Sequence, residues 1–99
     1  MNRPVLFSPE AITDLSDFLD YLVPLAGEAI ARRTVDRLIN HCRESSLFPE
    51  RGQAYDDIRP GLRIVGYRRR ASIAFVVMTD RIMILRIFIG GRQIRLDGL

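Results

Sequence analysis

The 99-residue sequence predicts an α+β fold, a two-layer β-α-α-β-β-β sandwich in which a helix hairpin packs on a mainly antiparallel sheet. A short apolar run at 5–7 precedes two stretches whose apolar residues recur at helical spacing. Three apolar runs of strand length follow, separated by short turns. The length suits one domain, residues 1–99, and a composition of 47% hydrophobic and 27% charged residues is globular rather than disordered.

The first helix is predicted to begin directly after the opening strand. Ser8 can accept hydrogen bonds from the unpaired N–H groups of the first turn, Pro9 needs no N–H there, and Glu10 suits the positive end of the helix dipole. We expect Pro24 to end this helix. The apolar residues of the stretch recur three and four positions apart, on one helix face: Ile12, Leu15, Phe18, Leu19 and Leu22.

The second helix is predicted to run from 26–28 to 42–44. Its arginines and Asp36 lie mostly off the apolar stripe. Because only a short loop separates the two helices, we expect them to form an antiparallel hairpin over one face of the sheet. The stripe consists of Ala31, Val35, Leu38, Ile39 and Cys42.

The three later strands are predicted at 62–68, 72–78 and 82–89. A Pro60-Gly61 turn precedes them, and Gly90-Gly91 ends the last one. Short connectors join the strands, so they should pair as an antiparallel meander.

Alternation along the last strand predicts which residues face the helices. Strict alternation places Met83, Leu85, Ile87 and Ile89 beneath the helices, and Ile82, Ile84, Arg86 and Phe88 on the opposite face. A two-layer fold has no second helix layer to cover that opposite face. We therefore expect an exposed apolar patch around Arg86 that binds a partner. The alternative is that the tail or a loop covers this face and that Arg86 pairs with a carboxylate.

The charge is distributed unevenly along the chain. The formal net charge is +3, and every basic residue other than His41 is an arginine. Residues 1–57 hold six arginines and ten acids, a balance of −4, whereas residues 58–99 hold nine arginines and two acids, a balance of +7. The basic C-terminal half predicts an anionic partner, either a nucleic acid or an acidic protein.

Several functional classes are disfavoured by the residues present. No apolar run reaches the roughly 18–20 residues of a membrane span, and the N-terminus lacks the long apolar region of a secretory signal. Cys42 is the only cysteine, which excludes an intrachain disulfide and fits a reducing cytoplasm. The adjacent His41 and Cys42 cannot hold a metal alone, and no glycine-rich phosphate loop is present. We therefore expect no metal, no cofactor and no catalytic residue.

Short motifs spread over nearly the whole chain carry a resemblance to a known family. The most specific are the turn Asp57-Ile58-Arg59-Pro60-Gly61-Leu62-Arg63 and the strand Ile84-Leu85-Arg86-Ile87. The others are Ser8-Pro9-Glu10-Ala11, Asp14-Leu15, Tyr21-Leu22, Ala29, Cys42, Phe75-Val76 and Gly91-Arg92. Together they resemble the RelE/ParE superfamily, the bacterial toxins of type II toxin–antitoxin pairs, whose fold is the sandwich predicted above.

The resemblance separates two activities. RelE-like members cleave mRNA on the ribosome with sheet arginines or lysines and often a C-terminal tyrosine or a histidine, whereas ParE-like members inhibit DNA gyrase. Here Ser72 and Ile89 stand at two positions where ribonuclease members often carry functional side chains, and no tyrosine follows Tyr67. Only Arg92 matches the ribonuclease pattern convincingly. The chain therefore resembles ParE more than RelE.

The resemblance implies an inhibitor that binds gyrase without catalysis and is neutralised by a ParD-like antitoxin, with no direct DNA binding by the toxin alone and no membrane contact. We expect Arg68, Arg70, Arg86 and Arg92 to contact the target. The antitoxin is expected to cover the helix-hairpin groove and the open sheet face: Leu15, Phe18, Leu19, Leu22, Ile84, Arg86 and Phe88.

Two alternatives stay open from the sequence. A ribosome-dependent endoribonuclease would use Arg63, Arg86 and Arg92 as phosphate-binding groups. A small interaction module with degenerate toxin ancestry would have neither activity.

Overall fold

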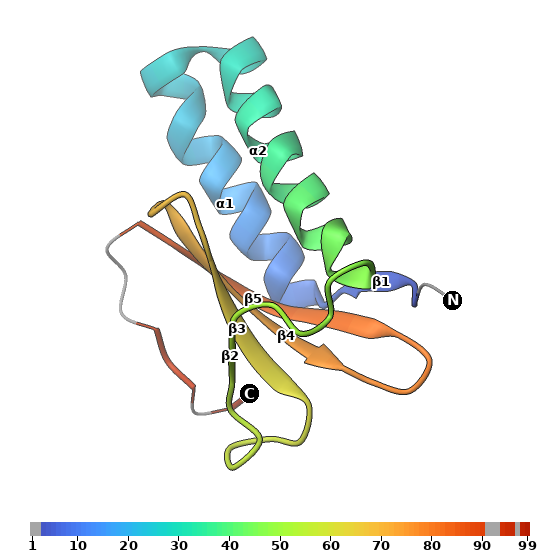
Figure 1. The fold of residues 1–99 in the computed structure, drawn as a ribbon. Coiled ribbons are helices and arrows are strands. Elements are labelled where there is room, and N and C mark those ends of the chain that lie inside the picture. The colour runs from blue at the N-terminus through green and yellow to red at the C-terminus, as the bar shows by residue number, and fades with distance from the viewer. Residues whose placement is uncertain (1–2, 91–93, 97) are drawn as a thin grey trace.

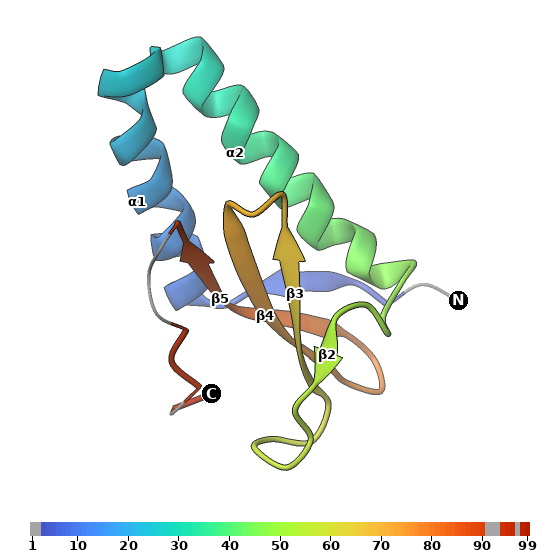
Figure 2. The same cartoon turned by 60° about the vertical axis from the view of Figure 1, so that its left-hand side comes forward.

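The computed structural model describes residues 3–90, 94–96 and 98–99, and it confirms the α+β fold: a helix hairpin packs on one face of a five-stranded sheet (Figures 1 and 2). The strand order is β1-β5-β4-β3-β2, with β1 parallel to β5 and every other pair antiparallel. The elements are β1 (Val5–Phe7), α1 (Pro9–Ala26), α2 (Glu28–Arg43), the 3₁₀ turn η1 (Glu44–Ser46), β2 (Gln53–Ala54), β3 (Leu62–Tyr67), β4 (Ala71–Val77) and β5 (Ile82–Ile89).

Ser8 starts α1 as predicted and also ties it to the sheet. Its Oγ accepts the Ala11 N–H at 3.0 Å and donates to the Leu85 carbonyl at 2.7 Å. Its own N–H donates to the Ile84 carbonyl at 2.9 Å. One of these bonds caps the helix and the other two fix its start against β5.

The expectation that Pro24 ends α1 is wrong, because the helix continues to Ala26 and the chain reverses at Gly27, where φ is +86°. Pro24 has no N–H to offer the carbonyl of Asp20 four residues earlier. Both residues are exposed, so water can bond that carbonyl instead. The far end of the hairpin projects beyond the sheet (Figure 2), and residues 24–30 are all exposed.

A β-bulge in β5 overturns the predicted strand faces for the first part of the strand. Ala74 pairs with Arg86 but Phe75 pairs with Ile84, so one extra residue, Leu85, interrupts the alternation. Ile84, like Ile82, is 0% exposed and lies in the core beneath the helices. Leu85 packs instead on the opposite face. The inserted residue inverts the faces of the side chains up to Leu85, which strict alternation cannot anticipate, whereas Ile87 and Phe88 beyond the bulge lie on the faces that were predicted.

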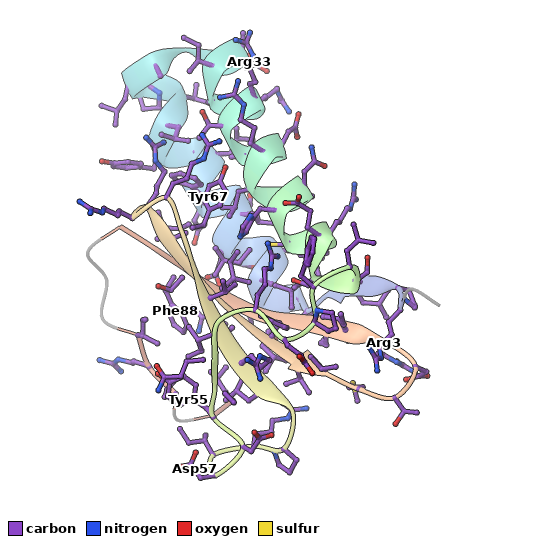
Figure 3. The ribbon with its side chains drawn as sticks, viewed as in Figure 1. Arg3, Arg33, Tyr55, Asp57, Tyr67 and Phe88 are labelled. Atoms are coloured by element: carbon purple, nitrogen blue, oxygen red, sulfur yellow. The ribbon has the colours of Figure 1, made fainter. Side chains whose placement is uncertain are left out.

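The opposite face of the sheet is covered by the chain itself, so the expected exposed patch is also wrong. Phe88 is 7% exposed in a second core. Tyr55 and Leu99 cover it, and Arg59 Nη1 donates to the Leu99 carbonyl at 2.7 Å. Figure 3 shows Tyr55 and Phe88 on the side of the sheet away from the helices. This second core comprises Leu62, Ala74, Val76 and Phe88, with Tyr55, Ile64, Leu85 and Leu99 packed against it.

Candidate functional site

Arg86 is held by the fold through a carboxylate, which is the alternative left open by the sequence. Its Nε donates to Asp14 Oδ2 at 2.8 Å and its Nη2 to Oδ1 at 3.1 Å. The same carboxylate accepts the Ile87 N–H at 2.8 Å. Hydrogen bonding to Asp14 raises the pKa of Arg86 above its ordinary value. The carboxylate thus joins α1 to β5 just beyond the bulge, and it takes up the Nε and one Nη2 donor of Arg86.

The turn between β3 and β4 carries three exposed arginines, Arg68, Arg69 and Arg70. The Arg70 N–H donates to the Tyr67 carbonyl at 2.8 Å and closes the turn. No ion pair links any of the three to another residue of the part the structure describes. The turn therefore presents three positive charges to solvent beside α2 (Figure 2). We call residues 68–70 the basic turn.

The backbone of the basic turn is strained. Arg68 and Arg69 have φ angles of +50° and +56°, in the left-handed region that glycine and asparagine adopt at low cost. For arginine this conformation costs on the order of 1–2 kcal/mol per residue. Turn chemistry alone favours Asn-Gly at these positions, so two arginines here carry a cost in stability that asparagine and glycine would avoid.

His41 and Tyr67 form the floor of a hollow between the basic turn and α2. The two rings are 4.7 Å apart at their centroids and inclined by 52°, and the Arg68 guanidinium lies 5.6 Å from the Tyr67 centroid. The hollow measures about 410 Å³, and a second hollow of about 330 Å³ neighbours it. Arg37, Tyr67 and Arg68 line both. We call the two neighbouring hollows together the α2–turn groove.

The environment of His41 favours its neutral form. Burial, together with the nearby charges of Arg51 and Arg68, lowers the pKa of His41 below 6.5, although Glu44 opposes the shift from 3.6 Å. Its Nε2 is inaccessible and has no hydrogen-bond partner among the residues that the structure describes. A proton would therefore be accommodated less well in the folded chain than in the unfolded chain.

We accordingly expect acid to destabilise the fold through His41. The unfolded chain takes up the proton first, so the free energy of unfolding should be unaffected above pH 6.5 and should fall as the pH drops below it. Urea unfolding between pH 7.5 and 5.5 measures this dependence. His41→Gln should flatten it, and an equal slope in the variant would contradict the assignment.

Cys42 belongs to the core rather than to a reactive centre. It is 0% exposed, and burial raises the pKa of its thiol to about 12. The neutral thiol is a poor nucleophile and a poor metal ligand. Within the described residues, no group of three or more His, Cys, Asp or Glu side chains is arranged to hold a metal ion. No helix of that same part is long and apolar enough to cross a membrane.

The arginines of the ribonuclease alternative are largely committed to internal contacts. Arg63 donates to the carbonyl oxygens of Glu50, Arg51 and Gly52 at 2.6, 2.9 and 3.0 Å. These bonds fix the segment before β2, a short strand that the sequence did not reveal. Arg86 is bound by Asp14 as described above. Arg92 lies outside the described residues.

Most residues predicted to meet an antitoxin are inside the fold. Leu15 and Phe18 are 9% and 4% exposed and pack between the helices and the sheet. Ile84 and Phe88 are buried on opposite faces of the sheet. Leu19 and Leu22 remain half-buried at the margin of the core, and the half-buried Arg86 is bound to Asp14.

Part of the apolar surface that remains exposed lies near the end of the helix hairpin, while Leu47 and Phe48, which follow α2, are 58% and 55% exposed elsewhere. Tyr21, Leu25 and Ile30 are 63%, 67% and 54% exposed. Sequence reasoning passed over them because they lie outside the most regular helical stripe, although apolar residues flanking a proline-containing helix end were a visible signal. Their position beyond the sheet leaves them without a covering layer.

Comparisons with known proteins agree with this geometry. A family model described as "ParE toxin of type II toxin-antitoxin system, parDE" matches residues 5–94. The chain is also similar to a solved structure described as "Chromosomal ParDE TA system from P. aeruginosa", with a TM-score of 0.75 and 25% sequence identity. The similarity covers 89% of this chain and 96% of that one. No curated protein matches the chain.

Proposed function

The chain belongs to the ParE toxin family of type II toxin–antitoxin systems, and from this premise we propose that it inhibits DNA gyrase by binding it, without catalysing a reaction itself. As a ParE-type toxin of a ParDE system, it has an antitoxin partner. We propose that this partner is ParD-like and neutralises the toxin in the cytoplasm.

The basic turn is the observation that supports target binding. Arg68 and Arg70 are exposed and unpaired among the described residues, whereas Arg86 is bound to Asp14. Exposed guanidinium groups on a protruding turn can meet carboxylates through paired donors and can steer association with an acidic surface. We therefore propose Arg68 and Arg70 as target contacts, with Arg92 remaining a predicted one, and assign Arg86 to positioning.

The exposed hairpin end supports a separate antitoxin contact. Tyr21, Leu25 and Ile30, with the half-buried Leu19 and Leu22, offer an apolar surface for an amphipathic helix. Its place at the far end of the hairpin separates it from Arg86 and Phe88. We propose that the antitoxin covers this surface.

A DNA supercoiling assay with purified gyrase tests the proposed target. We expect inhibition at stoichiometric toxin, and at least a roughly tenfold loss of potency in the double variant Arg68→Gln/Arg70→Gln. The matched control Arg33→Gln/Arg43→Gln removes the same charge from exposed α2 positions and should stay within about twofold, as expected for screened rim charges. Absence of inhibition at excess toxin, together with transcript cleavage in a translation extract, would overturn the proposal in favour of a ribonuclease.

A further inference from the structure

The α2–turn groove has a pronounced charge imbalance. Arg37 from α2 and Arg68 and Arg70 from the basic turn line it, and none of these three forms an ion pair with another described residue. Among the described residues that line it, the acid is Glu44, whose carboxylate lies 3.6 Å from Nδ1 of His41. Arg37 and Arg68 line both hollows and Arg70 lines the second, so three guanidinium groups without an ion pair to a described residue gather there and attract carboxylates or phosphates.

The groove also borders an open strand edge. The Tyr55 N–H donates to the Leu62 carbonyl at 2.8 Å, so the backbone of Leu62 faces β2. Alternation along β3 turns the backbone of Gly66, four residues later, toward the same side. The pairing of β2 with β3 stops at Ile64. Gly66 is exposed and lines the groove, so its N–H and carbonyl meet no strand within the described part of the chain.

A peptide fits these features better than a nucleic acid does. Tyr67 is 8% exposed and lies under His41 and Arg68, so its ring offers no open face on which a base could stack. An open backbone edge pairs with a peptide, which supplies its own N–H and carbonyl groups at the same spacing.

We propose that the α2–turn groove binds an extended acidic segment of a partner protein, which pairs with Gly66 through its backbone and places carboxylates against Arg37 and Arg68. This inference rests on the proposed function in that the site belongs to the surface assigned to partner binding. It goes further by naming the chemistry and conformation of what is bound. It also gives a role to Arg37, which the sequence pattern did not single out.

Because His41 is the only histidine of the chain, its ring NMR signals report directly on the groove floor. The probe is an eight-residue peptide with glutamate at alternate positions and threonine between, added to the full chain. We expect saturable shifts of the His41 signals and slower hydrogen exchange at the Gly66 amide. Arg37→Gln and Arg68→Gln should each weaken binding roughly tenfold or more, whereas Arg43→Gln, an exposed arginine that does not line the groove, should leave it within about twofold.

Three results would overturn the proposal. One is equal binding of a matched peptide with glutamine in place of glutamate. Another is equal or tighter binding of an eight-nucleotide single-stranded DNA, which would assign the groove to nucleic acid. The third is binding that leaves the His41 signals unchanged. None of these measurements involves gyrase, so a failure here is distinguishable from a failure of the supercoiling assay.

Discussion

Replacing Asp14 with alanine is expected to lower the free energy of unfolding by about 2–4 kcal/mol. The change removes three hydrogen bonds at once, two from Arg86 and one from the Ile87 N–H. Ile87 is 1% exposed, so its N–H would lose its acceptor in a site that water hardly reaches. Because 39% of the Arg86 side chain stays exposed and can be hydrated, the loss should remain below that of a fully buried ion pair.

Asp17→Ala provides the matched control for this prediction. Asp17 is an exposed acid on the same helix, and its replacement should change the free energy of unfolding by less than about 0.5 kcal/mol. Urea denaturation of the three proteins at pH 7.5 gives the comparison. A loss of under about 1 kcal/mol for Asp14→Ala would mean that the link between α1 and β5 does not depend on this carboxylate.

The double variant Arg68→Asn/Arg69→Gly is expected to change stability and inhibition in opposite directions. Asparagine and glycine adopt positive φ angles readily, so relief of strain at +50° and +56° should raise the free energy of unfolding by about 1–2 kcal/mol. Loss of two guanidinium groups should weaken inhibition of the target roughly tenfold or more. Opposite changes in the free energy of unfolding and in inhibition are expected if the charges of this strained turn contact the target.

Urea denaturation and the supercoiling assay together measure the two effects of this variant. The control Arg70→Gln, at the third position of the basic turn, removes a charge without relieving a positive φ angle. It should weaken inhibition while leaving stability nearly unchanged. A variant that is both more stable and fully inhibitory would exclude the basic turn from the contact.

Local patterns predicted the elements of this fold well, while the placement of residues on the two faces of the sheet required the structure. The Ser8 cap and the helical stripes depend on neighbours a few positions apart, so they are visible in the sequence. The bulge at Leu85 depends on how β5 meets β4 across the sheet, and no local signal marks it. The cover over Phe88 depends on Tyr55 and Leu99, which are distant in the chain.

The residues of the candidate site likewise fall into those that the sequence predicted and those that only the structure could place. Exposure of Arg68 and Arg70 follows from a polar run between two apolar strands, and the structure places both on the surface. The sequence left open whether Arg86 pairs with a carboxylate, and it could not identify Asp14 as the partner because the two residues lie 72 positions apart and only the fold brings α1 against β5. Arg37 joins the basic turn only because α2 crosses beside the β3–β4 hairpin, which the sequence cannot specify.

Hydrogen–deuterium exchange of the toxin, alone and bound to gyrase, tests most directly whether the basic turn is the surface that meets the target. We predict slower exchange on binding at residues 66–71, with little change at 55–62 and 94–96 beside the second core. Slower exchange only at 55–62 and 94–96, with 66–71 exchanging as fast as in the unbound chain, would contradict the account. It would place the target contact on the sheet face around Phe88.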